Sequence, residues 1–271
     1  MTTSTTTPAA ATDPDVPARL TLDVRAVAKS YGRGTASRHI LADVTFTVHQ
    51  GEFVTVVGPS GAGKTTLLRC LAGLLSPDAG EVALEGENVT APPKGLALVF
   101  QDYSRSLLPW MSVLGNVMLP LRRSGLKRTE RHRIAEQALQ AVGLAHATNL
   151  YPWQMSGGMQ QRAAIARAVA CRPEVLLMDE PFASVDAQTR ADLEDLMLRL
   201  REELGMTVVL VTHDIDEAVY LADRVIVLSG APTSVTEIIQ VPLPGPRDQL
   251  HTKLEPAFAE LRAHVLGLIR R

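Results

Sequence analysis

The sequence predicts an α/β fold built on a doubly wound, mostly parallel sheet, and two observations lead to this expectation. Short, continuous apolar runs rich in β-forming residues suit parallel strands that helices cover on both faces. These runs lie at residues 53–57, 175–178 and 207–211. Helical patterns separate them, at residues 64–74, 157–170 and 187–204. Strands that alternate with helices in this way predict a doubly wound sheet.

An N-terminal antiparallel β region precedes this sheet. Apolar and polar residues alternate at residues 20–24 and again at 44–48, which is the period-two pattern of strands with one buried face. We expect these residues to open the folded domain as a separate antiparallel sheet.

An inserted α-helical subdomain is expected at about residues 102–155, because this segment has helical patterns and no clear strand. Thr129 followed by Glu130 suits a helix start within it. The segment also carries a basic cluster, which we interpret as a solvated helix face; contact with nucleic acid or lipid head groups is the alternative. The cluster comprises Lys127, Arg128, Arg131, His132 and Arg133.

The two ends of the chain fall outside this pattern. The first 18 residues are rich in Thr, Ala and Pro and contain no Lys or Arg, so they do not match a secretory signal and are expected to form a disordered tail. After residue 230 the sequence predicts a short strand and a helix at 254–269. The expected organisation is a tail at 1–18, one domain at 19–230 and a C-terminal extension at 231–271.

Composition excludes several classes of protein. The 271 residues are 46% hydrophobic with a formal net charge of -2 and a sequence pI near 6.4. The chain can therefore fill a core but has no overall positive field for nucleic acid. No apolar run approaches the roughly 20 residues that a membrane-spanning helix needs. Cys70 and Cys171 lack the spacing of a metal site or disulfide framework, and both are expected to be buried thiols.

A phosphate-binding loop follows the first apolar run, where the pattern G-x-x-x-x-G-K-[ST] lies between a predicted strand and a predicted helix. Its glycines let backbone N–H groups point inward, and the helix N-terminus adds partial positive charge, which together make a nest for phosphates. Lys64 would neutralise phosphate charge and Thr65 would hold Mg²⁺. The sequence therefore predicts a P-loop NTPase that binds ATP and Mg²⁺. The expected nucleotide-binding residues are Gly58, Pro59, Ser60, Gly61, Ala62, Gly63, Lys64, Thr65 and Thr66.

Two carboxylates, Asp179 and Glu180, directly follow the apolar run at 175–178. The carboxyl ends of parallel strands are where α/β proteins place their ligand chemistry. Asp179 is the candidate for the Mg²⁺ shell, usually through water. Glu180 is placed to orient or deprotonate the water that attacks the γ-phosphate, because phosphoryl transfer needs an aligned nucleophile and charge neutralisation.

Ser156, Gly157 and Gly158 begin the segment Ser-Gly-Gly-Met-Gln-Gln-Arg, which resembles the signature loop of ATP-binding-cassette (ABC) ATPases. Ser156 suits a helix N-cap, and the two glycines let backbone N–H groups approach an anion. The resemblance runs over residues 20–229. In that family the signature loop closes over the nucleotide held by the other subunit, so the resemblance implies a homodimer with two shared ATP sites.

Other residues match motifs of the same family in order. The resemblance implies that Gln101 senses Mg²⁺ and the attacking water, and that His213 contacts the γ-phosphate and holds the catalytic carboxylate. Asp186 matches the loop that crosses the dimer interface, and Tyr31 matches the aromatic that stacks on adenine. Each of these has a plain structural interpretation when taken singly, but together their order favours function.

The departures from the family pattern are mild. Met155 and Met159 replace the commonest residues of the signature, and Val185 stands where Leu is common. After His213, Asp214 and Glu217 have the spacing of a capping box, so a helix is expected to start there and fix the position of the imidazole.

The resemblance implies an ATP-hydrolysing subunit, peripheral at the cytoplasmic face of the cell membrane, that energises transmembrane permease subunits and is served indirectly by an extracytoplasmic substrate-binding protein. Residues 107–111 are apolar and aromatic and are expected to dock on the permease; packing inside the helical subdomain is the alternative. With residues 114–117 they are similar to importers of nitrate, aliphatic sulfonates and taurine.

Two other functions remain as alternatives. One is a soluble ATPase of the same family, for DNA repair, translation or iron–sulfur assembly. Such a protein is expected to contain a coiled coil or a second cassette, and neither pattern occurs in the sequence. An ATP-binding regulatory module without turnover is opposed by the presence of both Glu180 and His213.

Overall fold

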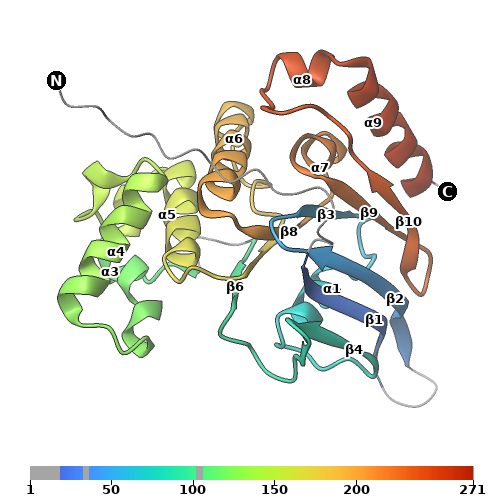
Figure 1. Cartoon of the computed structure of the whole chain (residues 1–271), viewed down its shortest axis with the longest axis horizontal. Coiled ribbons are helices and arrows are strands. Elements are labelled where there is room, and N and C mark those ends of the chain that lie inside the picture. Colours follow the sequence, from blue (N-terminus) through green and yellow to red (C-terminus); the bar gives the residue numbers. More distant parts are fainter. Residues whose placement is uncertain (1–18, 33–36, 102–105, 271) are drawn as a thin grey trace.

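The computed structural model describes residues 19–32, 37–101 and 106–270 of the 271-residue chain. The tail predicted at residues 1–18 lies outside these described residues. Figure 1 shows a central sheet, with helices α3, α4 and α5 gathered at one end of the molecule and the C-terminal helices α8 and α9 at the other.

The central sheet is mostly parallel, as predicted. Within the described ranges it contains six strands in the order β10-β9-β3-β8-β7-β6, and only β10 runs antiparallel to its neighbour. Parallel strands need long crossover connections, so their carboxyl ends meet at one edge, where ligands bind in folds of this type. The strands are β3 (Phe53–Val57), β6 (Leu96–Val99), β7 (Val175–Asp179), β8 (Thr207–Thr212), β9 (Arg224–Ser229) and β10 (Ser234–Gln240).

The N-terminal antiparallel sheet is confirmed, and its strands are longer than the alternating pattern indicates. A register shift between Val24 and Val27 interrupts the two-residue period, so the pattern fades although the strand continues. In the part of the chain that is described, the order is β2-β1-β4-β5. The strands are β1 (Leu20–Tyr31), β2 (Arg38–His49), β4 (Ala79–Leu84) and β5 (Glu87–Asn88).

The hydrophobic core lies on both faces of the central sheet. On one face, Leu67, Leu68 and Leu71 of α1 (Lys64–Leu71) pack with residues of both sheets. On the other face, residues such as Phe53 and Met178 pack against α5 (Gly157–Val169), α6 (Ala187–Leu204), α7 (Ile215–Leu221) and α9 (Pro256–Ile269). Successive side chains of a strand point to opposite faces, which explains why strands covered on both sides read as continuous apolar runs.

The inserted segment is helical, as predicted. It contains α3 (Val113–Met118) and α4 (Arg128–Ala141), which pack against each other and against α5. Short 3-10 turns connect them, namely η2 (Pro120–Arg123), η3 (Ala145–Ala147) and η4 (Pro152–Gln154). Helix α4 begins at Arg128, one residue before the predicted start at Thr129.

Three sequence expectations need correction. The helix predicted at 64–74 ends at Leu71, because Gly73 takes a left-handed conformation with φ 65° and turns the chain. The helix predicted at 254–269 divides into α8 (His251–Leu254) and α9, because Pro256 suits only a first helical turn. Cys70 is buried as expected, but Cys171 is exposed, since it lies just beyond the C-cap of α5 at Ala170.

Candidate nucleotide-binding site

The phosphate loop connects β3 to α1 at the carboxyl edge of the central sheet. At two positions of this loop, neighbouring atoms are so close that only glycine fits. A Cβ on Gly58 would lie 2.7 Å from the carbonyl oxygen of Leu228, and one on Gly63, where φ is 74°, would lie 2.5 Å from Cγ2 of Ile40. The loop is therefore wedged between β9 and β2, and this packing fixes the curvature that a phosphate nest requires.

Lys64 is folded back over this loop. Its Nζ donates hydrogen bonds to the carbonyl oxygens of Gly58, at 2.9 Å, and Pro59, at 3.2 Å. Burial lowers the pKa of Lys64, although Glu180 and Asp179 act in the opposite direction. A cation held in this way can exchange carbonyl oxygens for the oxygens of a bound phosphate with little loss of side-chain entropy.

Thr65 and Asp179 form a pair of oxygen donors beside the loop. The hydroxyl of Thr65 donates to Oδ1 of Asp179 at 3.3 Å, and burial raises the pKa of Asp179. Mg²⁺ prefers oxygen ligands and is commonly held by one or two protein groups together with waters and substrate phosphates. In the described part of the chain no group of three or more His, Cys, Asp or Glu side chains could hold a metal alone. Two oxygen donors of this kind suit Mg²⁺ that also binds a nucleotide.

Glu180 lies at the end of β7 and is held from two sides. Oε2 of its carboxylate accepts a hydrogen bond from Nε2 of Gln101 at 3.3 Å and lies 3.0 Å from Nδ1 of His213. Its backbone N–H donates to the carbonyl of Val211, and its φ of 43° is uncommon for a residue other than glycine. Residues in such sparsely populated conformations cluster at functional sites, where the surroundings fix them.

These groups line one large cavity of about 900 Å³. Tyr31, which is 43% exposed, lines it together with the phosphate loop, Gln101, Glu180 and His213. The structure thus brings together most of the predicted nucleotide-binding residues. Asp179 and Ala62 are buried and do not line the cavity, but Asp179 accepts a hydrogen bond from Thr65, which does.

The signature residues lie elsewhere. Ser156, Gly157, Gly158 and Asp186 are described but do not line this cavity. The hydroxyl of Ser156 caps α5 by accepting from the Met159 N–H at 3.3 Å, and Asp186 caps α6 by accepting from the Thr189 N–H at 2.9 Å.

These two helix starts are in contact with each other. A Cβ on Gly158 would lie 2.5 Å from Cγ2 of Thr189, so α5 approaches α6 where Asp186 caps it. The signature loop and the loop before α6 therefore form a second surface, separate from the phosphate loop of the same chain.

The cavity also includes residues that sequence reasoning missed. They are Arg38, Ile40, Ile215, Leu266, Ile269 and Arg270. Arg38 is paired across the antiparallel strands with Tyr31, a signal that becomes visible only once the register of β1 and β2 is known. The last three come from the end of α9, about which no local motif gives information.

A doubly wound sheet with a phosphate loop at its carboxyl edge defines the class of P-loop NTPases. Residues 41–183 match the family described as ABC transporter. The uncharacterized ABC transporter ATP-binding protein MJ0412 of Methanocaldococcus jannaschii is 46% identical over 230 residues, which are 85% of this chain and 84% of that protein. The chain belongs to the ATP-binding subunits of ABC transporters, which hydrolyse ATP.

Other similar proteins carry more specific names. The nitrate import ATP-binding protein NrtD of Synechococcus elongatus is 42% identical over 234 residues, which cover 85% of each chain. NrtC of the same organism is 43% identical over 234 residues, but the match spans only 35% of its length.

Solved structures agree with the fold. The dimeric, post-hydrolysis state of the ATP-binding cassette MJ0796 bound to ADP and Pi has a TM-score of 0.72 and 34% identity, covering 81% of this chain and 98% of that one. None of the helices in the described ranges is long and apolar enough to cross a membrane.

Proposed function

We propose that this chain is the ATP-hydrolysing subunit of an importer for a small oxyanion, and that Glu180 is its catalytic carboxylate. The observation that carries the proposal is the arrangement of Gln101 and His213 around one oxygen of Glu180, at the edge of the cavity that contains the phosphate loop. Phosphoryl transfer depends on positioning and electrostatics, and these are what the arrangement supplies.

Each side chain has a role that its position suits. Lys64 and the N–H groups of the loop bind phosphate oxygens, and Tyr31 stacks on adenine. Glu180 orients the attacking water and accepts its proton, while His213 holds Glu180 and contacts the γ-phosphate. Thr65, Gln101 and Asp179 would hold Mg²⁺ directly or through water; the ion would neutralise charge on the phosphates.

The second surface completes the site in a homodimer. Ser156, Gly157 and Gly158 of one subunit would contact the nucleotide in the cavity of the other, with Asp186 at the interface. Their separation from the phosphate loop within one chain, and the dimeric cassette among similar structures, support this arrangement. We retain the division into an ATPase domain at 19–230, with a helical subdomain at about 102–155, and an extension at 231–271.

Docking on the permease is proposed for the exposed aromatic residues of the helical subdomain. Leu107 is buried, as the packing alternative expects, whereas Trp110 is 72% exposed. Trp153, equally exposed, stacks on Tyr151 with ring centroids 6.1 Å apart. A hydrogen bond from the Val113 N–H to the Leu150 carbonyl joins the two segments. Exposed aromatic side chains of this kind suit a protein interface.

The solute class rests on the relatives. NrtC and NrtD are named for nitrate import, and CmpC of Synechococcus elongatus is named for bicarbonate transport. CmpC is 41% identical over 252 residues, but the match covers only 38% of its length. Aliphatic sulfonates and taurine remain in the proposal from the sequence resemblance. These names favour transport over the soluble alternative. From the sequence resemblance we also propose a peripheral position on permeases at the cytoplasmic face, served by an extracytoplasmic binding protein.

The test measures hydrolysis and uptake with the same variants. Glu180→Gln should lower kcat for ATP by about 100-fold or more while ATP still binds, because the amide cannot accept a proton. Lys64→Ala should abolish uptake of one labelled solute among nitrate, bicarbonate, alkanesulfonate and taurine in source cells. Glu202→Gln, an exposed carboxylate on α6, is the matched control. Full hydrolysis by Glu180→Gln would refute its role, and unchanged uptake of all four solutes would refute the solute class.

A further inference from the structure

A second, smaller cavity shares Glu180 and His213 with the nucleotide cavity. Its volume is about 40 Å³, and its remaining lining residues are Phe182, Ala183, Arg190, Thr212, Asp214 and Glu217. A water molecule needs roughly 10 to 15 Å³ of such space and two to four polar partners. The cavity is therefore large enough for water, and most of its lining is polar.

Arg190 lines this cavity and carries a buried donor without a partner. Its Nη1 pairs with Oδ2 of Asp214 at 3.1 Å, whereas its Nε is buried and has no hydrogen-bond partner among the described residues. Buried donors without a partner are rare in native proteins, and each indicates an acceptor such as an ordered water. A cation would be repelled by the guanidinium, so water is the occupant that this donor favours.

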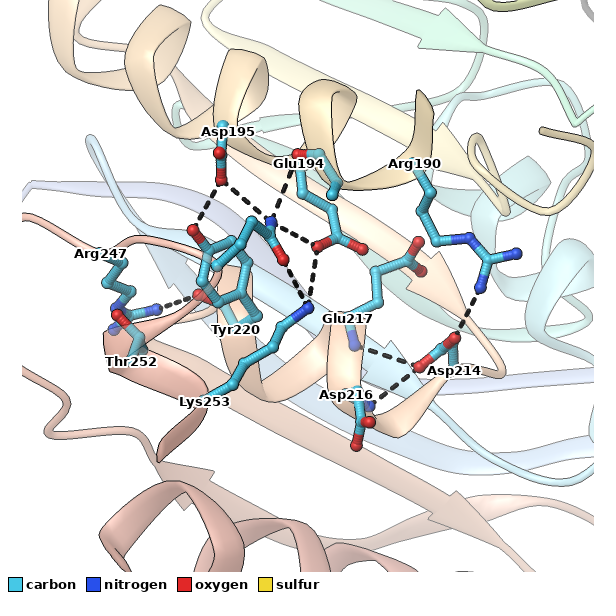
Figure 2. Close-up of polar contacts among 12 residues, drawn as sticks. Arg190, Glu194, Asp195, Asp214, Asp216, Glu217, Tyr220, Arg247, Thr252 and Lys253 are labelled. Atoms are coloured by element: carbon cyan, nitrogen blue, oxygen red, sulfur yellow. Dashed lines mark hydrogen bonds and ion pairs between the residues drawn. The ribbon is translucent and has the colours of Figure 1, made fainter. Parts of the chain in front are cut away.

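Glu217 lines the same cavity with a carboxyl group that the hydrolysis scheme above does not use. It is only 4% exposed, and Figure 2 shows it with Glu194 on one side and Arg190 on the other. Burial raises its pKa to about 8, and the carboxylates of Glu194 and Asp214 act in the same direction. Thr212 and Arg190 act in the opposite direction but do not cancel the effect. Near neutral pH the group therefore carries a proton and can donate a hydrogen bond.

We propose that Arg190 and Glu217 bind a water molecule in this cavity and that the water donates a hydrogen bond to the carboxylate of Glu180. Both residues are then positioning residues for hydrolysis, and the inference rests on the proposed role of Glu180. The water would accept from Nε of Arg190 and from the protonated carboxyl of Glu217, which leaves its own hydrogens for Glu180.

This water would constrain Glu180 from a further direction. Gln101 and His213 both contact Oε2 of the carboxylate, so the water would add a contact that neither of these side chains supplies. A nucleophile-orienting group loses rate steeply when its position is loosened. At a pH above the pKa of Glu217, its carboxylate would accept a hydrogen bond from the water, which would then have one fewer for Glu180. Its negative charge would also repel that of Glu180.

The experiment compares Glu217→Gln and Glu217→Leu with wild type in purified full-length protein. The amide can still bind the water but cannot ionise, so kcat should stay within about twofold at neutral pH and its alkaline decline should disappear. Leucine cannot bind the water, so kcat should fall about tenfold with the dissociation constant for ATP unchanged. Asp216→Asn, which removes a half-buried carboxylate paired with Arg262 from the same helix, should keep the wild-type pH profile.

The outcomes separate this inference from the proposed function. Wild-type hydrolysis that Lys64→Ala abolishes establishes the ATPase on its own. An alkaline decline that persists in Glu217→Gln, or a kcat unchanged in Glu217→Leu, would overturn the positioning role. If the leucine variant does not fold, the pH profile of the near-isosteric glutamine variant decides.

Discussion

At the scale of single residues, the burial of Glu217 has a consequence for stability. Its pKa rises from 4.5 to about 8 in the folded chain. Below pH 4.5 the carboxyl is neutral in both states, and between 4.5 and 8 only the unfolded chain releases the proton. The contribution of Glu217 to the free energy of unfolding therefore falls as the pH rises through this window and is constant above it.

Glu217→Gln should remove that dependence, because the amide is neutral at every pH. We expect the Tm of the variant, relative to wild type, to rise from about pH 5 to about pH 8 and then level off. Thermal unfolding in a buffer series measures this difference, and Asp216→Asn should show no such trend. A difference in Tm that is flat across the window would mean that Glu217 ionises in the folded protein as it does in water.

The same scale shows which residues a sequence can reveal. The positions of Lys64 and Thr65 at the cavity were predictable, because they follow from the spacing of one loop. The roles proposed for Arg190 and Glu217 could not be predicted, because they depend on a cavity shared by α6, α7 and the end of β7. Cys171 was placed wrongly because helical periodicity does not mark the residue at which burial ends.

At the scale of elements, a polar clasp joins α8 and the residues before it to α6 and α7 (Figure 2). Gln249 donates from Nε2 to Oε2 of Glu194 at 2.9 Å and to Oδ1 of Asp195 at 3.0 Å. Lys253 donates from Nζ to Oε1 of Gln249 at 2.6 Å and lies 3.5 Å from Oε2 of Glu194. Tyr220 of α7 donates to the same oxygen of Asp195 at 2.6 Å. The clasp therefore ties α8 to α6 and α7.

Lys253→Met should destabilise the protein by roughly 1 to 3 kcal/mol, because it leaves the buried carboxylate of Glu194 without its cation. The lysine is 31% exposed, which keeps this figure below that of a fully buried pair. Adding Glu194→Gln should recover most of the loss, and urea unfolding of both variants measures it. Arg199→Met breaks an exposed pair with Glu203 and serves as the control. If the two changes lowered the free energy of unfolding additively, the clasp would be excluded.

Sequence patterns predict an element well when residues close to it in the sequence determine where it begins and ends. Helix α6 begins and ends as predicted, because a regular apolar period and an Asp186 cap define it. The clasp could not be foreseen, since Glu194 and Lys253 are far apart in the sequence and a buried Glu looks like any helix-surface residue. The division between α8 and α9 follows from Pro256, a signal that was present in the sequence and outweighed by the apolar pattern around it.

At the scale of the whole molecule, the proposed function implies that one chain presents two incomplete halves of an ATP site. The phosphate loop and Glu180 line the large cavity, while Ser156, Gly157 and Gly158 lie outside it. Backbone N–H groups at the capped start of α5 can bind an anion, but these residues do not line the cavity of their own chain. A head-to-tail dimer with two-fold symmetry brings each half to its complement, and both sites then form or neither does.

Shared sites predict that two inactive variants restore activity when mixed. Lys64→Ala damages the phosphate loop, and Gly157→Glu places a negative charge where an anion should bind. A mixed dimer contains one site with both halves intact, so equal amounts should recover up to about a quarter of wild-type hydrolysis, because about half of the dimers are mixed. ATPase assays of each variant and of the mixture measure this, and Glu202→Gln mixed with Lys64→Ala controls for dilution. If each chain worked alone, the mixture would stay as inactive as its parts, and the signature loop would need a different role.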